Sequence, residues 1–307
     1  MSKLEKFEFA RSRGIVWVCD LADSSKYLND NQTADELETF LPRLYLIASM
    51  VVDAADGKFI KWTGDGFMGW FETPLHRMVG KEAAKVFNAA TQLTLLTNVT
   101  QLGLKPKRKF KIRHGVTYEQ DALLINIRHT GGFESLDVIG RSVVLAFRLA
   151  GITAEYPSIA TQKDLVVASV GHVKPTAKFL KWQMSASDKL KYFKGERWGT
   201  EGIYLSGDKS RKVKSPQAVL RQAKRAIHRV ETESEESDEN LDFTRRLLKN
   251  MEGGPEWCRE VLNDYTRFVT ESLLGTLKRV VPMLEELERK PGRPPKVKDG
   301  GSKKQKK

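Results

Sequence analysis

GIVWVCD, residues 14–20, is an unbroken apolar run that ends at a carboxylate. A run of this kind is typical of a strand that is buried on both faces of a sheet. Beyond it, the spacing of apolar residues predicts a helix from Thr33 to Val51, with Thr33 and Glu36 forming a capping box at its start. The sequence therefore predicts a strand followed by a helix, with Asp20 at the end of the strand.

A hairpin is expected next. Residues 58–62 and 67–71 are short β-prone runs on either side of a Gly64-Asp65-Gly66 turn. If the hairpin lies beside the first strand, Asp20 and Asp65 converge. Two carboxylates together with substrate phosphates are what Mg²⁺ or Mn²⁺ binds, and two such ions about 3.5–4 Å apart can support an in-line phosphoryl displacement. The alternative is that Asp20 caps a turn and Gly-Asp-Gly only forms one.

The rest of the chain divides into three regions. Strands alternate with helices over residues 10–207, as in α/β or α+β domains. Residues 213–288 are expected to form a helical extension, and the Pro-, Gly- and Lys-rich tail 289–307 to be disordered. Further elements expected in the first region are helices over 75–97 and 141–150, with strands over 110–117, 122–127, 134–138, 165–168, 192–193 and 202–205. In the extension, helices are expected over 216–230 and 241–287, and an apolar stripe over 273–287.

The charge, apolar runs and cysteines of the sequence limit the kinds of partner and site that are expected. The net charge is +13, and the tail 289–307 holds nine Lys or Arg and one Asp. Such a tail suits an acidic partner, and Pro291–Lys296 loosely resembles a minor-groove motif, so nucleic-acid binding is a secondary prediction. No run approaches the ~20 apolar residues of a membrane helix, and the charged N-terminus is not a signal peptide. With two cysteines that lack metal-ligand spacing, a cytoplasmic protein with buried thiols is expected. There is no phosphate-binding glycine loop and no GxSxG motif.

Two further segments carry candidate residues. Lys61 precedes Asp65 by four residues, so in a strand it would share a face with Thr63 and Asp65 and reach a substrate held there. The alternative is an ordinary exposed lysine. In DVIGRSVVLAFR, residues 137–148, a strand ends at Asp137 and a helix presents Arg148, which could make a bidentate contact with a phosphate. The alternative is a solvated helix face.

In this order, the segments resemble the catalytic domain of class III nucleotidyl cyclases. The resemblance covers residues 10–207 and leaves the C-terminal third unmatched. It implies an α+β fold of the α/β sandwich type, a ferredoxin-like cyclase domain that uses two divalent metal ions, Mn²⁺ or Mg²⁺. It is carried by GIVWVCDLADSS (14–25), KWTGDGFMGWF (61–71), KIRHGV (111–116) and DVIGRSVVLAFRL (137–149).

The resemblance also implies residue roles. Asp20 and Asp65 would bind the metals with help from the Leu21 carbonyl, Lys61 and Asp137 would read the base, and Arg148 would stabilise the transition state. Lys194 or Arg197 would bind phosphate. In this family the site lies between two subunits of a homodimer, with the metal ligands from one chain and the base-reading residues and Arg148 from the other.

One position departs from the family pattern. The helix usually carries an asparagine four residues before the arginine, where it orients the ribose, and this chain has Val144 there. Valine cannot hydrogen-bond a ribose, so either another residue such as Arg141 does so, the ribose is held differently, or activity is reduced.

The stand-alone domain with its own C-terminal extension resembles the bacterial pyrimidine cyclases of the Pycsar anti-phage system. This implies a cyclic nucleotide made from UTP, or next from CTP, that acts on a separate effector protein; Tyr45 is a candidate for facing the smaller base. Three alternatives stay open. Lys61 with Asp137 is the pair that adenylate cyclases use for adenine, a degenerate domain could be a nucleotide- or nucleic-acid-binding module, and a polymerase-like palm also places two carboxylates on a small sheet.

Overall fold

The computed structural model describes residues 6–27, 31–107, 109–128, 134–152, 159–170, 179–182, 184–193, 202–206, 238–265 and 267. Its elements are β1 (Lys6–Leu21), α1 (Ser24–Tyr27), α2 (Asn31–Ala54), β2 (Lys58–Trp62), β3 (Phe67–Glu72), η1 (His76–Met78), α3 (Val79–Leu104), β4 (Ile112–Arg128), β5 (Glu134–Ile139), α4 (Arg141–Ala150), β6 (Ile159–Gln162), α5 (Lys163–Ser169), β7 (Phe179–Lys181), α6 (Ala186–Phe193), β8 (Ile203–Ser206) and α8 (Asp238–Glu252). Residues 256–265 are also helical.

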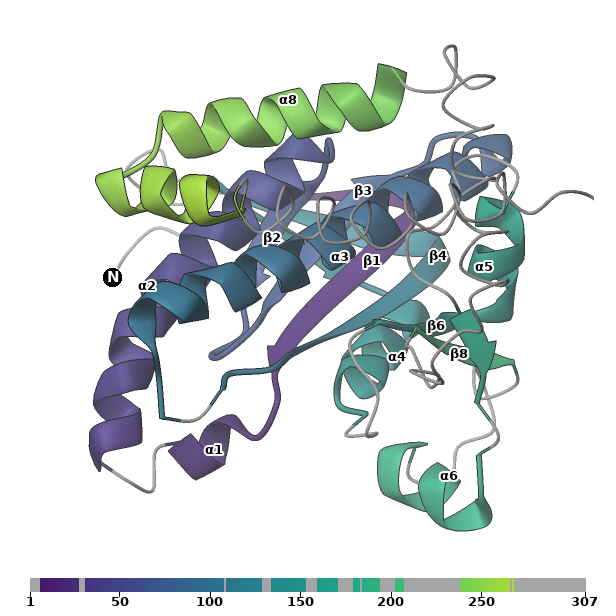
Figure 1. Ribbon diagram of the computed structural model, residues 1–307. Coiled ribbons are helices and arrows are strands. Elements are labelled where there is room, and N and C mark those ends of the chain that lie inside the picture. The colour runs from purple at the N-terminus through teal and green to yellow at the C-terminus, as the bar shows by residue number, and fades with distance from the viewer. Residues whose placement is uncertain are drawn as a thin grey trace, which may run out of the picture. The chain divides into compact units, whose positions relative to one another are not determined.

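The sheet has the ferredoxin-like arrangement. Its strand order is β2-β3-β1-β4-β6-β8-β7, and β5 pairs with β4. The first four strands are antiparallel neighbours and follow the chain order β1-α2-β2-β3-α3-β4, which is the β-α-β-β-α-β motif. Figure 1 shows α2 and α3 on one face of this sheet and α4 on the other. The predicted α+β class and ferredoxin-like fold are confirmed.

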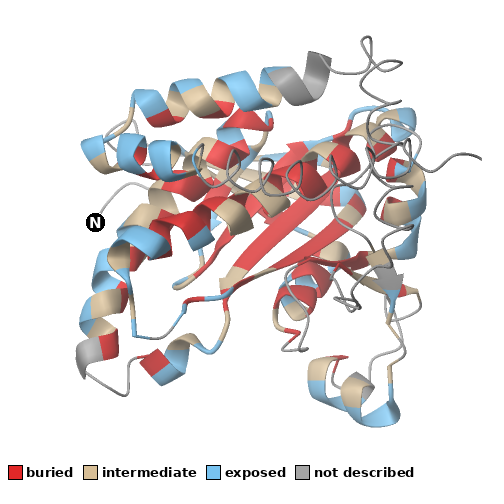
Figure 2. Ribbon diagram, viewed as in Figure 1, coloured by how far each residue is buried: buried red, intermediate tan, exposed pale blue. Residues whose placement is uncertain are grey.

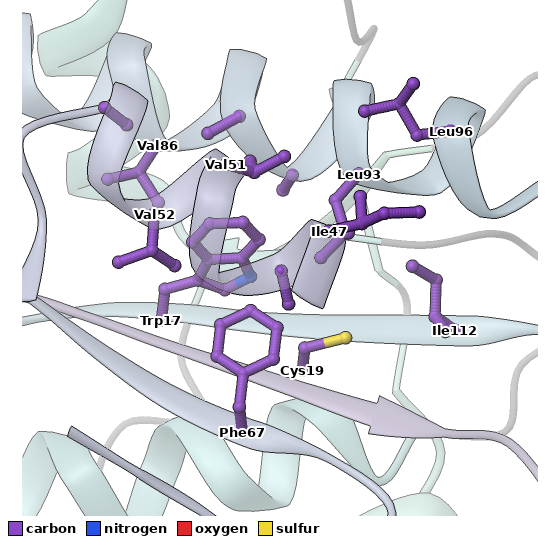
Figure 3. Packing of buried hydrophobic residues seen from close by; sticks show 14 of the residues in the cluster. Trp17, Cys19, Ile47, Val51, Val52, Phe67, Val86, Leu93, Leu96 and Ile112 are labelled. Atoms are coloured by element: carbon purple, nitrogen blue, oxygen red, sulfur yellow. The ribbon is translucent and has the colours of Figure 1, made fainter. Parts of the chain in front are cut away.

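Residues 14–19 of β1 are apolar, and both faces of the strand are covered there. Side chains alternate between the faces of a strand: Trp17 and Cys19 pack under α2 and α3 with Val51 and Leu93 (Figure 3), whereas Val16, with Val18, belongs to a second cluster beneath α4. Residues 14–19 of β1 are all buried, and Figure 2 shows the middle of the sheet in red. Asp20 continues the Val16–Val18 series and therefore lies on the α4 face.

Close backbone packing sets the position of α4 on the sheet. A Cβ atom at Gly115 of β4 would lie 1.9 Å from the carbonyl oxygen of Ala146 and 2.7 Å from the backbone nitrogen of Ala150. Only a glycine permits this approach. The last turns of α4 are thus pressed directly onto β4.

His114 is buried beneath α3 and is fully hydrogen-bonded. Trp17 Nε1 donates to His114 Nδ1 at 3.1 Å, so the ring proton is on Nε2, 2.9 Å from Thr94 Oγ1. The Thr94 hydroxyl in turn donates to the Ala90 carbonyl at 2.9 Å. Burial lowers the pKa of His114 to about 3, so the imidazole is neutral in the folded protein.

This histidine should make the protein less stable in mild acid. Below about pH 6.5 the unfolded chain binds a proton at His114 and the folded chain does not. The contribution of the neutral, buried imidazole to stability is therefore complete above pH 6.5 and is lost as the pH falls toward 3. We expect this group to remove about 2 kcal/mol from the free energy of unfolding between pH 7 and pH 5. Urea unfolding at both pH values checks this: the pH-dependent loss should shrink by that amount in His114→Gln and stay unchanged in His76→Asn, an exposed histidine. If His114→Gln loses as much unfolding free energy between pH 7 and pH 5 as the wild type, His114 is not the group responsible.

Two predicted strands are helices. Residues 165–168 belong to α5, in which Leu165 is buried and Val167 is 62% exposed, so only one side of this apolar run is covered. Residues 192–193 end α6. The sheet position beside β4 is taken instead by β6, which pairs with it in parallel and was not expected.

Other boundaries also differ from the expectation. The capping box is wrong: α2 begins at Asn31, the Thr33 hydroxyl donates to the Tyr27 carbonyl at 2.6 Å, and the Glu36 carboxylate accepts from the Lys107 amide. Strands expected separately over 110–117 and 122–127 form the single strand β4. The helix expected over 75–97 starts with a 3₁₀ turn, η1, and continues through α3 to Leu104.

Part of the C-terminal extension packs onto the domain that contains the sheet. Residues 1–211 and 235–266 form one compact unit, in which Arg246 of α8 forms an ion pair with Asp56 and Met251 is buried. Further along, Arg43 of α2 stacks on the Trp257 ring at 5.1 Å and Tyr265 donates to Gln92 at 3.0 Å. Cys19 and Cys258 are both buried and free, as expected. The predicted helix 216–230, the stripe 273–287 and the tail 289–307 lie outside the described residues.

Among the described residues, no helix combines the length and the apolar composition needed to cross a bilayer.

Candidate metal and nucleotide site

The Gly64-Asp65-Gly66 turn is seated against the end of β1. Phe67 pairs with Cys19, and the Thr63 amide donates to the Gly66 carbonyl at 2.9 Å to close the turn. A Cβ at position 66 would lie 2.1 Å from the Cys19 carbonyl oxygen, and Gly64 has a φ of +88°. Both glycines are therefore required by the backbone, and Asp65 between them is held beside Asp20.

The two carboxylates influence each other electrostatically. The pKa of Asp20 is raised, chiefly by burial. The Arg113 guanidinium lowers this pKa in part, and the Asp65 carboxylate raises it further. Like charges held together in this way are stabilised by a bound cation.

This pair of carboxylates fits divalent ions that also bind substrate. Among the described residues, no group of three or more His, Cys, Asp or Glu side chains is placed to hold a metal ion. Mg²⁺ is commonly bound by one or two carboxylates together with phosphate oxygens, and the donor set of Asp20 and Asp65 matches that chemistry. Leu21, whose carbonyl was predicted to help, is the last residue of β1; its contribution stays a prediction.

Tyr45 braces the turn that carries Asp65. Its hydroxyl donates to the Gly64 carbonyl, and its ring centroid lies 3.8 Å from that of Trp62. Burial, and next the Asp65 carboxylate, raise the pKa of the Tyr45 phenol. The structure therefore places Tyr45 at the predicted metal ligands, and a contact with the base stays a prediction.

Lys61 and Asp137 form an ion pair between β2 and β5. Lys61 Nζ lies 2.7 and 2.8 Å from the two carboxylate oxygens. A bulge between Phe59 and Lys61 sets Lys61 opposite Met68, which packs in the cluster on the α4 face. The strand alternation expected through Asp65 is wrong, because β2 ends at Trp62. The Lys61 side chain meets Asp137, its predicted base-reading partner, and its reach to a substrate held by Asp65 stays a prediction.

Helix α4 carries Arg148 and the two positions discussed for the ribose, Arg141 and Val144. Arg148 Nη1 donates to the Phe193 carbonyl at the end of α6, at 3.2 Å. Val144, where the family has asparagine, is 46% exposed one turn earlier, and Arg141 is exposed at the start of the helix. Residues 141, 144 and 148 share a helix face. Lys194 and Arg197, the predicted phosphate-binding residues, lie outside the described residues.

Arg113 is a site residue that the sequence did not single out. It lies opposite Asp20 in the β1–β4 pairing, and its Nη2 donates to the Asp20 carboxylate. It precedes Gly115 by two residues, so both face α4. The Arg-x-Gly spacing could have indicated this role: the glycine lets α4 approach, and the arginine beside it reaches the end of the same helix.

The comparisons with known proteins come from solved structures. No protein-family model and no curated protein matches the sequence. The chain is similar to the adenylyl cyclase CyaB from P. aeruginosa, with 19% identity and a TM-score of 0.46 over 66% of this chain and 98% of that one. It is similar to the guanylyl cyclase Cya2, with 15% identity and a TM-score of 0.49 over 67% of this chain and 96% of that one. It is also similar to a class III adenylyl cyclase-like ATP-binding protein from Pseudomonas aeruginosa, with 18% identity and a TM-score of 0.43 over 52% and 35%.

At these identities and TM-scores the similarities carry no argument about activity.

Proposed function

We propose that this protein is a nucleotide cyclase that converts a nucleoside triphosphate into its 3′,5′-cyclic nucleotide and pyrophosphate. The observation that carries the proposal is the seating of the Gly64-Asp65-Gly66 turn on the end of β1, which brings Asp65 beside Asp20. A Lys61–Asp137 pair suited to hydrogen-bonding a base belongs to the same sheet. The four sequence segments that resemble class III cyclases contain these residues.

Each residue then has a task. Asp20 and Asp65 would hold two divalent ions, Mn²⁺ or Mg²⁺, and such ions activate a hydroxyl and neutralise a pyrophosphate leaving group. Arg148 would meet the charge that grows on the α-phosphate, through a charge-assisted contact. The reaction needs no covalent intermediate, so positioning and charge stabilisation supply the catalysis.

The proposed enzyme is a homodimer whose subunits share each site. Support comes from one face of the sheet segment in which residues 6–12 of β1 pair with residues 122–128 of β4, and β4 pairs with β5. On it, Phe7 and the 63% exposed Phe9 stack with ring centroids 6.3 Å apart, and the cross-strand neighbours Leu123, Ile125 and Ile127 are only half-buried. Exposed apolar surface of this kind suits a second copy of the chain.

The base is proposed to be uracil, with cytosine next. Lys61 donates and Asp137 accepts, so the pair can bind the polar edge of either pyrimidine, but the adenine edge also offers an acceptor beside an amino group. ATP therefore stays an alternative substrate. The product is proposed to act on a separate effector in anti-phage defence, in the cytoplasm.

A second candidate function is favoured by Val144. An apolar, 46% exposed side chain stands where a ribose-binding asparagine would be expected, so a binding module without catalysis is the alternative, and its basic tail would add nucleic-acid contacts.

The test is to incubate the full chain with Mn²⁺ and each of ATP, CTP, GTP and UTP, and to identify products by mass spectrometry. We expect cyclic UMP from UTP, a smaller amount of cyclic CMP, and neither with Asp65→Ala. Cyclic AMP alone would assign the enzyme to the adenylate cyclases. Absence of any cyclic product, with each triphosphate still bound, would favour the binding module.

A further inference from the structure

One arginine joins the proposed metal site to helix α4. Arg113 Nη2 donates to the Asp20 carboxylate, and Nη1 donates to the Gly151 carbonyl, at 3.3 Å, just beyond the last turn of α4. The Arg113 side chain is only 15% exposed. Its Nε atom is buried and has no hydrogen-bond partner among the described groups. The guanidinium is thus held between β4 and α4 by its two Nη groups.

Arg113 and a divalent ion require the same carboxylate. The guanidinium donates to the Asp20 carboxylate and partly offsets the burial and the neighbouring Asp65 charge, which together raise the pKa of Asp20. A metal ion on Asp20 would bring a second cation next to the guanidinium, in a partly buried place where charges are weakly screened. Either the ion displaces Arg113 from Asp20, or it binds against strong repulsion.

We infer that Arg113 is the counter-cation of Asp20 in the metal-free protein, and that a divalent ion binds by displacing it from the carboxylate. The inference rests on the proposed function only for the role of Asp20 as a metal ligand. Arg113 acts as a positioning residue, because it keeps its hydrogen bond to Gly151 and so holds α4 in place when the ion enters. Its positive charge disfavours the ion alone, whereas an ion that arrives on a triphosphate brings negative charge that offsets the repulsion.

Binding of Mn²⁺ alone to the full chain, followed by the electron paramagnetic resonance signal of free Mn²⁺, tests this without any turnover. Arg113→Gln removes the charge and is expected to lower the Mn²⁺ dissociation constant about tenfold. Arg113→Lys, the matched control, keeps the positive charge although not the two-armed contact to Asp20 and Gly151, so its Mn²⁺ dissociation constant should lie closer to that of the wild type than to that of Arg113→Gln. A folded Arg113→Gln chain that binds Mn²⁺ no more tightly than the wild type would overturn the inference.

A second measurement uses the wild type and so does not depend on whether Arg113→Gln folds. In a side-chain ¹⁵N spectrum of the arginines, the Arg113 resonance is identified by its loss in Arg113→Lys, and saturating Mg²⁺ should shift it. An unmoved resonance would refute displacement.

The role of Asp20 is separable from that of Arg113. If Asp20→Asn leaves Mn²⁺ binding unchanged, the metal site itself is wrong and the proposed function fails with it. If Asp20→Asn abolishes binding but Arg113→Gln does not tighten it, only the counter-cation role fails.

Discussion

Asp65→Asn is expected to lower the rate of cyclisation on the order of 10³-fold. The change removes one negative charge and keeps the size of the side chain, so the divalent ions that Asp65 is proposed to hold would lose a ligand. Ion-mediated charge stabilisation contributes several kcal/mol to a transition state, and each 1.36 kcal/mol is a factor of ten in rate. The measurement is the initial rate of cyclic nucleotide formation at saturating Mn²⁺ and triphosphate.

The fold should tolerate this change. Asp65 is half-buried at a turn whose conformation is set by Gly64 and Gly66. We therefore expect the midpoint of thermal unfolding to stay near that of the wild type. Asp121→Asn is the matched control: Asp121 is an exposed carboxylate paired with Arg11, and losing such a pair costs little. A rate that falls equally in Asp121→Asn, or stays normal in Asp65→Asn, would refute the metal assignment.

The core of the fold could be predicted because its pattern is local. The run at residues 14–20 is apolar on both faces, and the structure buries it between α2, α3 and α4. The run at 165–168 has similar composition but became helix α5. What differs is tertiary: β6 already occupies the place beside β4, and only one side of the run is covered. A short apolar run does not carry that information.

The site could be predicted in part, for the same reason. The glycines at 64 and 66 predict the turn. Its position beside Asp20 follows because β3, which begins just after the turn, pairs with β1. The contact between Lys61 and Asp137 joins residues 76 apart and depends on a bulge near Ile60, and that between Arg113 and Asp20 joins residues 93 apart. Bulges and cross-strand registers are set by packing of the whole sheet. The Arg-x-Gly spacing could therefore indicate that Arg113 faces α4, but not that Asp20 is its partner.

Mixing two inactive variants should restore activity if each site is shared between subunits. Asp65→Asn damages the metal half of a site, and Arg148→Ala damages the half contributed by α4. In a mixed dimer, one site collects both defects and the other has none. After equal amounts are allowed to exchange subunits, half of the dimers are mixed, so we expect about a quarter of the wild-type rate, far above the rate of either variant alone.

The matched control for this mixing experiment is Asp65→Asn with Asp20→Asn. Both defects then lie in the same half of a site, so every site in the mixed dimer carries one of them and no activity should return. Affinity tags that differ between the two chains establish that mixed dimers have formed. Arg148 donates to the Phe193 carbonyl, so the unfolding midpoint of Arg148→Ala must be compared with that of the wild type. Mixed dimers of Asp65→Asn with Arg148→Ala that stay inactive would show that each chain builds its site alone. Recovery of activity in the control mixture would mean that each site takes its Asp20 and its Asp65 from different chains.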